Sequence, residues 1–254
     1  MMNNDGAAEL RQTPAGPKAW SEQEFRTLVL AGKPRTAVFD CDGTLWNGDS
    51  GDGFMTWSIE QGLVSRSTAD WIDARYRAYR AGQNSEAQMC GEVVQMYAGL
   101  REQELREAAE RYAVEFINKL VFPEMAALVK ALRHGETEIW AVSSTNKWVI
   151  AAGVRELGIA EERVLAVEAR VVNGLITSEL LDVPNGEGKA AALRRAGVEQ
   201  PDAVFGNSIH DLAMLAMARK AFPVNPTPAL MQEAARRGWG YFSPAGARSM
   251  VTNG

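Results

Sequence analysis

The pattern of hydrophobic and polar positions along the chain predicts two kinds of structure. Short apolar runs that suit buried parallel strands alternate with segments that have the periodicity of helices. These runs cover residues 36–40, 139–143, 203–206 and 221–224. Between residues 47 and 119 only the helical periodicity occurs. Because alternating strands and helices form parallel sheets with right-handed crossovers, we expect an α/β fold whose alternation is interrupted by a helical block.

Capping patterns indicate where several of the helices begin. Ser21 and Glu24 have the spacing of a capping box, which predicts a helix that ends near Gly32. Pro228 directly after Thr227 suits the first turn of the last helix. In the helical block the periodicity predicts four helices, over about residues 54–63, 71–79, 85–98 and 101–120.

Two segments of different composition complete the predicted elements. Residues 1–19 are polar and rich in Gly, Ala and Pro, so we expect a disordered tail. The pair Asn173-Gly174 lies between apolar residues and predicts a tight β-hairpin turn.

Charge and cysteine content limit the classes of partner. The chain has 254 residues, a net charge of −5 and no block of Lys and Arg, which argues against nucleic acid or an anionic membrane as a partner. Cys41 and Cys90 have no motif spacing, so we expect no disulfide framework and a reducing compartment. No signal-peptide pattern or membrane-spanning apolar run occurs, which predicts a soluble, cytoplasmic protein. The sequence does not indicate the oligomeric state.

The first apolar run ends in two aspartates, Asp40 and Asp42, followed by Gly43. Ligands of open α/β sheets bind beyond the carboxyl ends of the strands, and glycine allows the chain to turn sharply there. Two adjacent carboxylates repel each other unless a cation lies between them, and Mg²⁺ prefers such oxygen ligands. One carboxylate could then act as a nucleophile and the other as a proton donor and acceptor. An Asp-rich turn without a catalytic role is the alternative explanation.

Three later segments extend this pattern. Residues 38–45 resemble the first motif of the haloacid dehalogenase superfamily, Asp-x-Asp-Gly-Thr, and Ser143 closes an apolar strand as in its second motif. Lys189, after residues 186–188, resembles the third motif, and residues 206–211 resemble the Gly-Asp-x-x-x-Asp loop of the fourth. This loop carries an asparagine where the family usually has its first aspartate. The resemblance covers about residues 35–241, and four motifs in order are far more specific than one.

The resemblance implies a three-layer, Rossmann-like parallel sheet with an inserted all-helical cap domain. Residues 20–46 and 120–254 would form the α/β core, and residues 47–119 the cap. A helical cap directly after the first motif is typical of the phosphoserine phosphatase-like branch of the superfamily.

The resemblance also implies a mechanism, in which Asp40 attacks phosphorus to give an aspartyl-phosphate. Asp42 would act as general acid and then as general base, and Ser143 and Lys189 would stabilise the phosphoryl oxygens. Further contacts to the phosphate ester are expected from Gly43, Thr44 and Ser144. The expected cofactor is Mg²⁺, with ligands from Asp40, Asp42, Asn207 and Asp211.

The resemblance gives only a partial prediction of the substrate, a small-molecule phosphate ester. Asp49 stands where this branch has an acid that binds the substrate ammonium group, but Val93 stands where it has a carboxylate-binding arginine. Phosphoserine, phosphoethanolamine and phosphocholine are the candidates, and aromatic residues of the cap favour an ammonium group.

The sequence also bears on several other functions. Asp42 argues against dehalogenation, because a halide leaving group needs no proton, and the absence of lysine from residues 46–118 argues against a phosphonatase. A phosphomutase or phosphotransferase would use the same aspartate pair. A non-catalytic protein that binds a phosphorylated ligand is the alternative that Asn207 suggests.

Overall fold

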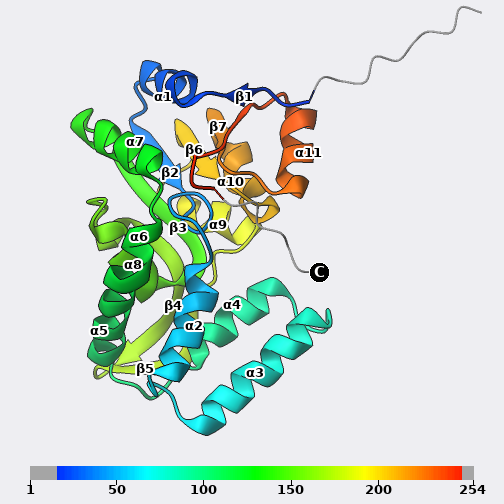
Figure 1. Ribbon diagram of the computed structural model, residues 1–254. Helices are drawn as coiled ribbons and strands as arrows, with labels where there is room; N and C mark the ends of the chain where they lie inside the picture. The colour runs from blue at the N-terminus through cyan, green and yellow to red at the C-terminus, as the bar shows by residue number, and fades with distance from the viewer. Residues whose placement is uncertain (1–15, 248–254) are drawn as a thin grey trace, which may run out of the picture.

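The computed structural model describes residues 16–247, and its centre is a six-stranded sheet (Figure 1). The strand order is β5-β4-β3-β2-β6-β7, and every neighbouring pair is parallel except β4 and β5. The strands are β2 (Thr36–Phe39), β3 (Glu138–Asn146), β4 (Val164–Val172), β5 (Leu175–Asp182), β6 (Ala203–Gly206) and β7 (Lys220–Pro223). The predicted parallel sheet is therefore confirmed, and so is the hairpin, whose strands β4 and β5 meet at the turn Asn173-Gly174.

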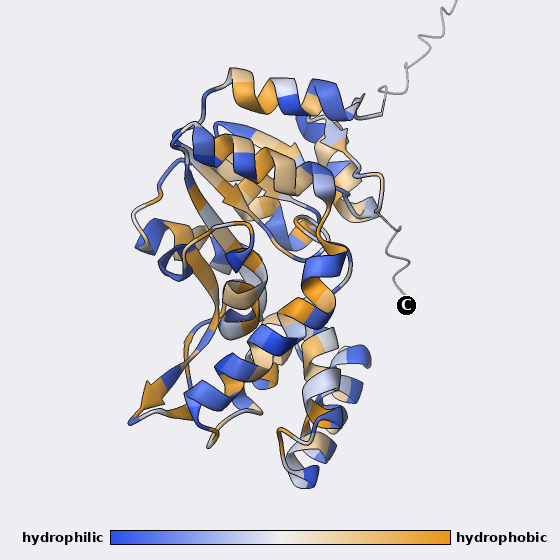
Figure 2. Cartoon of the chain, turned by 60° about the vertical axis from the view of Figure 1, so that its left-hand side comes forward, coloured by the Kyte–Doolittle hydropathy of each residue, from blue (hydrophilic) through white to orange (hydrophobic). Residues whose placement is uncertain are grey.

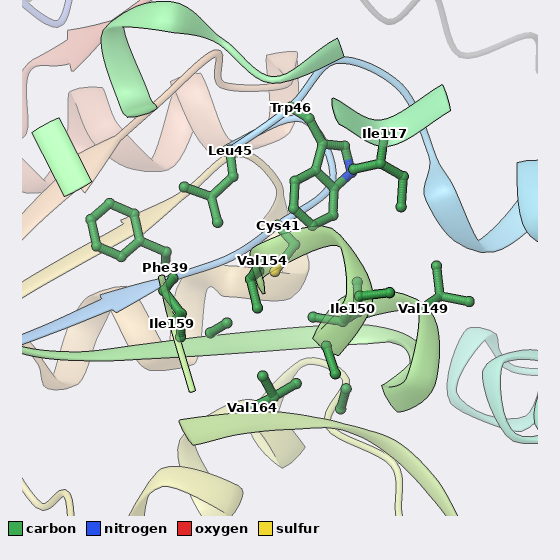
Figure 3. Close-up of a cluster of buried hydrophobic side chains, with 14 of the residues drawn as sticks. Phe39, Cys41, Leu45, Trp46, Ile117, Val149, Ile150, Val154, Ile159 and Val164 are labelled. Atoms are coloured by element: carbon green, nitrogen blue, oxygen red, sulfur yellow. The ribbon is translucent and has the colours of Figure 1, made fainter. Parts of the chain in front are cut away.

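Helices cover both faces of the sheet. Successive residues of β2 point to opposite faces, so each face packs against its own set of helices. Ala37 and Phe39 belong to one hydrophobic cluster and Val38 to another. The first cluster includes residues of α1 (Glu22–Ala31), α7 (Pro123–His134) and α8 (Lys147–Arg155). The second includes residues of α9 (Glu187–Arg195), α10 (Leu212–Met217) and α11 (Pro228–Arg237). This arrangement confirms the three-layer α/β fold, and Figure 3 shows Phe39, Val154 and Val164 within the first cluster.

A row of aromatic rings fixes the register of the central strands. Phe39 lies opposite Phe205 in the β2–β6 ladder, and Phe205 lies opposite Phe222 in the β6–β7 ladder. The ring centroids are 4.2 Å and 5.1 Å apart, respectively, and both pairs are stacked. Such pairs contribute roughly 0.5–1.5 kcal/mol beyond their burial. Since Asp40 and Gly206 directly follow two of these rings, the row also aligns the ends of β2 and β6.

The block between β2 and β3 is helical, as predicted. Its helices are α2 (Ser50–Glu60), α3 (Arg66–Arg80), α4 (Glu86–Gln95) and α5 (Glu102–Tyr112). The single helix expected over residues 101–120 is interrupted, because α5 is followed by a π-helical turn (Ala113–Ile117) and the short α6 (Asn118–Leu120). Figure 2 shows hydrophilic and hydrophobic positions alternating along the helices, which is the pattern from which they were predicted.

Backbone hydrogen bonds join the helical block to the β4–β5 hairpin. Gly99 N–H donates to the Ile176 carbonyl at 2.8 Å, and Ile176 N–H donates to the Leu100 carbonyl at 2.9 Å. Glu102 N–H also donates to the Gly174 carbonyl at 2.9 Å. The connection between α4 and α5 therefore extends the hairpin edge and fixes α4 against the sheet. The boundaries of the expected cap domain stay a prediction.

The chain ends show one difference from the predicted elements. Residues 1–15 of the predicted disordered tail lie outside the described residues. Ala19, placed in that tail, instead begins β1 (Ala19–Trp20), which pairs in parallel with β8 (Tyr241–Phe242). The pairing is stabilised by Trp20, whose ring lies 5.8 Å from that of Phe222. Strands of two residues have no periodicity from which a pattern could predict them.

One negative finding concerns membranes. No helix within residues 16–247 is both long enough and apolar enough to cross a bilayer.

Candidate active site

A cavity of about 280 Å³ lies where β2, β3 and β6 end, between the sheet and the helical block. Seven of the predicted site residues line it: Asp40, Asp42, Asp49, Ser143, Ser144, Lys189 and Asn207. The other three, Gly43, Thr44 and Asp211, lie directly behind these and contact them, as described below. The structure thus brings residues from positions 40 to 211 into one site, because three adjacent parallel strands end at the same edge of the sheet.

Lys189 joins two carboxylates at the bottom of the cavity. Its Nζ lies 2.7 Å from Asp40 Oδ1 and 2.5 Å from Asp211 Oδ1. Only 5% of Asp40, 2% of Lys189 and none of Asp211 is exposed. The Thr44 hydroxyl donates to the second oxygen of Asp40, Oδ2, at 2.8 Å. Asp40 is therefore held in one orientation from both of its oxygens.

The charges of this cluster do not cancel. Burial raises the pKa of Asp40 to about 7, and the nearby Asp211 contributes to this rise, while Lys189 opposes it. Burial also lowers the pKa of Lys189, but Asp211 and Asp40 outweigh this effect and raise it above its ordinary value. Two carboxylates and one ammonium leave an excess of one negative charge when all three are ionised. A bound cation would compensate this charge.

Asp42 is positioned by three hydrogen-bond donors from different parts of the chain. Trp46 Nε1 and the Ser50 backbone N–H both donate to Oδ1 at 2.7 Å. The Thr145 hydroxyl donates to Oδ2 at 2.9 Å. Ser50 is the first residue of α2, whereas Thr145 lies near the end of β3. The Asp42 carboxylate is thus fixed jointly by the helical block and the sheet, and it faces the cavity.

The two serines in the second half of β3 have different partners. Ser143 Oγ accepts a hydrogen bond from the Thr145 N–H at 3.1 Å, which leaves its own hydroxyl proton available. Ser144 Oγ donates to the Pro184 carbonyl at 2.9 Å and lies 3.2 Å from Asn185 Nδ2. Ser143 is therefore suited to donate to a ligand, whereas the Ser144 hydroxyl is already engaged.

The first and fourth motifs touch each other at Gly43 and Asn207. Gly43 has φ +74°, and a Cβ added there would lie 2.0 Å from Asn207 Nδ2, so the position requires glycine for both reasons. Asn207 is 4% exposed and lines the cavity. Its amide oxygen is therefore a candidate ligand for a cation bound in the cavity.

Asp211 shapes the loop that carries Asn207. Its Oδ2 accepts the backbone N–H groups of Asn207 and Ser208, each at 2.9 Å, while its Oδ1 lies against Lys189. Both carboxylate oxygens are therefore engaged within the protein. Asp211 holds the loop and Lys189 in place.

The side of the cavity formed by the helical block is acidic and partly aromatic. Asp49 caps α2, and its Oδ1 accepts the Asp52 N–H at 2.9 Å. Desolvation of its carboxylate is the main cause that raises the pKa of Asp49 to about 6, and the charge of Asp42 is the second cause. The residue as a whole remains exposed, so solvent screens part of this interaction. Tyr76 and Tyr79 of α3 complete this wall.

Sequence reasoning missed a contact that crosses the cavity mouth. His210 Nε2, from the loop of the fourth motif, lies 2.6 Å from Glu86 Oε2 at the start of α4. The hydrogen bond to Glu86 raises the pKa of His210, although partial burial opposes the rise. Trp46 and Thr145 were not predicted either, because their separations of four and 103 residues from Asp42 correspond to no recognisable motif.

A cation site would have to use more than carboxylates. Within residues 16–247 no group of three or more His, Cys, Asp and Glu side chains is arranged to hold a metal ion. The available oxygen donors at the cavity are mixed: the Asp40 carboxylate, the Asp42 backbone and the Asn207 amide. Such hard oxygen donors suit Mg²⁺, and the residues present therefore fit this ion.

Comparison with known proteins identifies the family. The family model described as haloacid dehalogenase-like hydrolase matches residues 37–216. A probable phosphatase from Mycobacterium tuberculosis is 27% identical over 247 residues, which cover 94% of this chain and 82% of that protein. A histidinol-phosphatase from Neisseria meningitidis is 26% identical over 213 residues, which cover 80% of this chain and 96% of that protein.

Solved structures show the same fold. A protein of unknown function from Bordetella pertussis superposes with a TM-score of 0.73 at 21% identity, over 82% of this chain and 97% of that chain. A substrate-bound phosphoserine phosphatase superposes with a TM-score of 0.54 at 15% identity, over 82% of this chain and 92% of that chain. The family match confirms the resemblance to the superfamily, and the solved structures share its fold. The chain therefore belongs to the haloacid dehalogenase-like hydrolase family and is an enzyme of the hydrolase class.

Proposed function

We propose that the protein is a Mg²⁺-dependent phosphatase that hydrolyses small-molecule phosphomonoesters through an aspartyl-phosphate on Asp40. The observation that carries this proposal is the buried arrangement of Asp40, Lys189 and Asp211 at the bottom of the cavity, with Asp42 beside it. The phosphatase names of two relatives support it. A panel of phosphomonoesters, assayed with and without Mg²⁺, tests it by the release of inorganic phosphate.

The reaction would proceed in two steps. In the first, a carboxylate oxygen of Asp40 bonds to phosphorus while the bond to the leaving alcohol breaks, and Asp42 gives the alcohol its proton. In the second, Asp42 takes a proton from water, which attacks phosphorus and releases phosphate from Asp40. Lys189 would neutralise charge on the phosphoryl oxygens, and the Ser143 hydroxyl would donate to one of them.

The backbone around these side chains would contribute further donors. We propose that Ser144 of β3 contacts the phosphoryl group through its N–H group. Gly43 and Thr44 would act by shaping the first loop around Asp40, because their N–H groups already donate to the carbonyls of Trp46 and Cys41, at 2.8 Å and 3.1 Å. This assignment accords with the engaged hydroxyls of Thr44 and Ser144, which leave little side-chain capacity for substrate.

Mg²⁺ would be held by the Asp40 carboxylate, the Asp42 backbone carbonyl and the Asn207 side chain. Asp211, whose two oxygens are engaged by Lys189 and by backbone N–H groups, would support the site from behind. When bound, the ion would compensate the excess negative charge of the cluster and draw charge from the phosphate.

Restoring a carboxylate at Asn207 should strengthen Mg²⁺ binding. Asn207→Asp adds a negative charge to a neutral ligand, so we expect the Mg²⁺ concentration for half-maximal activity to fall about tenfold. Titration of both forms against one aryl phosphate measures this midpoint. Metal-dependent protection against thermal unfolding gives a readout without turnover.

A matched control separates this effect from a general change of charge. Asp202→Asn alters an acid at the opposite end of β2, where its side chain accepts the N–H groups of Arg35 and Thr36. It should leave the Mg²⁺ midpoint unchanged. If Asn207→Asp also leaves the midpoint unchanged, Asn207 is not a ligand.

We further propose that the substrate carries an amino group, as phosphoserine, phosphoethanolamine and phosphocholine do. Asp49 lies at the cavity, and Asp52, Tyr76 and Tyr79 extend the same wall, which suits an ammonium group. The relative named a histidinol-phosphatase adds histidinol phosphate to the panel, because that ester also bears an amine.

Removing the charge of Asp49 should weaken binding of amine-bearing esters selectively. Asp49→Asn retains a side-chain oxygen for the α2 cap, whereas alanine would also remove the cap and cost roughly 0.5–2 kcal/mol of stability. We expect KM for phosphoethanolamine to rise about tenfold, the effect of one ion pair near a protein surface, and KM for 4-nitrophenyl phosphate to change little. An equal change of KM for both esters would show that Asp49 acts only as the cap of α2.

The alternative of a phosphotransferase or phosphomutase is separated by the fate of the phosphoryl group. A hydrolase releases inorganic phosphate in the same amount as alcohol, whereas a transferase yields less phosphate when an acceptor alcohol is added. The alternative of a binding protein without activity predicts no turnover for any ester in the panel.

A further inference from the structure

The charged side chains that the helical block contributes to the cavity are all acidic. Asp49 and Asp52 lie at the start of α2, and Glu86 is the first residue of α4. The other side chains from these helices and α3 are neutral: Met55, Tyr76, Tyr79, Met89, Cys90 and Val93. This wall faces the catalytic aspartates, so it would surround the alcohol part of a bound phosphate ester.

Among the described residues that line the cavity, Lys189 and His210 are the ones that can carry a positive charge. Lys189 lies at the phosphate end, between Asp40 and Asp211. His210 lies nearer the helical block, but its Nε2 is 2.6 Å from Glu86 Oε2. Both cations are therefore paired with carboxylates of the protein before any substrate binds.

Glu86 is held in this pairing from both of its oxygens. While Oε2 contacts His210, Oε1 accepts a hydrogen bond from Asn185 Nδ2 at 3.1 Å. Asn185 in turn lies 3.2 Å from Ser144 Oγ, beside the second motif. The position of Glu86 in the first turn of α4 also favours its negative charge. The contact is thus built from the helical block, the fourth-motif loop and the segment before α9.

We propose that Glu86 is a specificity-determining residue, which pairs with His210 so that the cavity offers no cation to a substrate carboxylate. The inference rests on the proposed phosphatase function and narrows its substrate class. The preferred substrate is a phosphomonoester whose alcohol carries an ammonium group and no carboxylate. A substrate carboxylate would find no partner and would be repelled by Asp49, Asp52 and Glu86. A substrate ammonium group would be attracted by the same three acids.

A matched pair of substrates tests this selectivity. O-phosphoethanolamine and O-phospho-L-serine differ only in the carboxylate, so the ratio of their kcat/KM values measures its effect. We expect the native protein to prefer phosphoethanolamine by about tenfold or more, the discrimination that one unfavourable charge interaction gives. Preference for phosphoserine would overturn the inference.

Two variants of α4 should shift this ratio toward phosphoserine. Glu86→Gln removes one repelling charge and releases His210, and we expect the ratio to move about tenfold. Val93→Arg places a cation on the same wall and should move it in the same direction, which covers the case that Glu86→Gln does not fold. Thermal unfolding establishes that each variant is folded. If neither folded variant moves the ratio, the inference is wrong.

Two further variants identify the cause of the shift. Glu60→Gln changes an exposed acid at the end of α2, outside the cavity, and should leave the ratio as in the native protein. Adding His210→Gln to Glu86→Gln should cancel part of the gain for phosphoserine, because His210, once released from Glu86, could donate a hydrogen bond to the substrate carboxylate. A full gain in the double variant would show that His210 takes no part.

The assay also separates this inference from the proposed function on which it rests. If the native protein with Mg²⁺ does not hydrolyse 4-nitrophenyl phosphate or any other ester, the phosphatase proposal fails. If it hydrolyses the aryl ester but does not discriminate between phosphoethanolamine and phosphoserine, only the role of Glu86 fails.

Discussion

Asp40→Asn should abolish phosphatase activity while the protein remains folded. An amide does not attack phosphorus, so we expect a loss of about 10⁴-fold or more in kcat, the scale on which removal of a nucleophile acts. The fold should survive, because asparagine can still accept hydrogen bonds from Lys189 or Thr44, the two present partners of Asp40. Hydrolysis of 4-nitrophenyl phosphate and the thermal unfolding midpoint are the two measurements.

A second aspartate on the same strand pair provides the control. Asp202 lies beyond the amino end of β2, far from the cavity, and Asp202→Asn should retain nearly all activity even if it lowers stability. Substantial turnover by folded Asp40→Asn would contradict the aspartyl-phosphate mechanism. Trapping of a covalent phosphoprotein in the native enzyme, and its absence in the variant, would test the intermediate directly.

Asp42→Asn should produce the second largest loss, and its size should depend on the leaving group. General acid catalysis contributes roughly 10²–10⁴-fold, and we expect this loss for alkyl phosphates such as phosphoethanolamine. An aryl alcohol leaves as an anion with little help from an acid, so 4-nitrophenyl phosphate should be affected much less in the first step. Single-turnover rates for both esters separate that step from hydrolysis of the intermediate.

The surroundings of Asp42 make this variant interpretable. The asparagine oxygen could accept the hydrogen bonds of Trp46 Nε1 and the Ser50 N–H, and its amide could face the Thr145 hydroxyl. The orientation of the side chain should therefore be retained and only the transferable proton lost. Equal losses for alkyl and aryl esters would assign Asp42 a structural role.

The sequence predicted most of the sheet and the bottom of the site. β2, β3 and β6 were recognised from short apolar runs, and the polar residue that comes after the apolar residues of each run lines the cavity: Asp40, Ser143 and Asn207. Adjacent parallel strands end at one edge, so residues far apart in the chain could be expected to meet there. The prediction succeeded because a buried strand leaves a strong local pattern.

Other parts of the site left no such pattern. Trp46 and Thr145 position Asp42 through an indole and a hydroxyl, groups that occur throughout protein sequences without this role. Glu86 and His210 are in contact although they are 124 positions apart in the chain, and each alone is typical of a solvent-exposed residue. The contact between residues 99–102 and the β4–β5 hairpin was missed for the same reason, since it consists of backbone hydrogen bonds.

The sequence by itself determined the α/β alternation, the helical block and the identity of the residues that can carry the chemistry. These depend on local periodicity, capping and short motifs, which are properties of neighbouring residues. Only the tertiary structure decided which oxygens are already engaged: Asp211 by Lys189 and backbone N–H groups, and Glu86 by His210. Hydrogen bonds and ion pairs depend on distances between side chains brought together by packing, and spacing along the chain does not encode those distances.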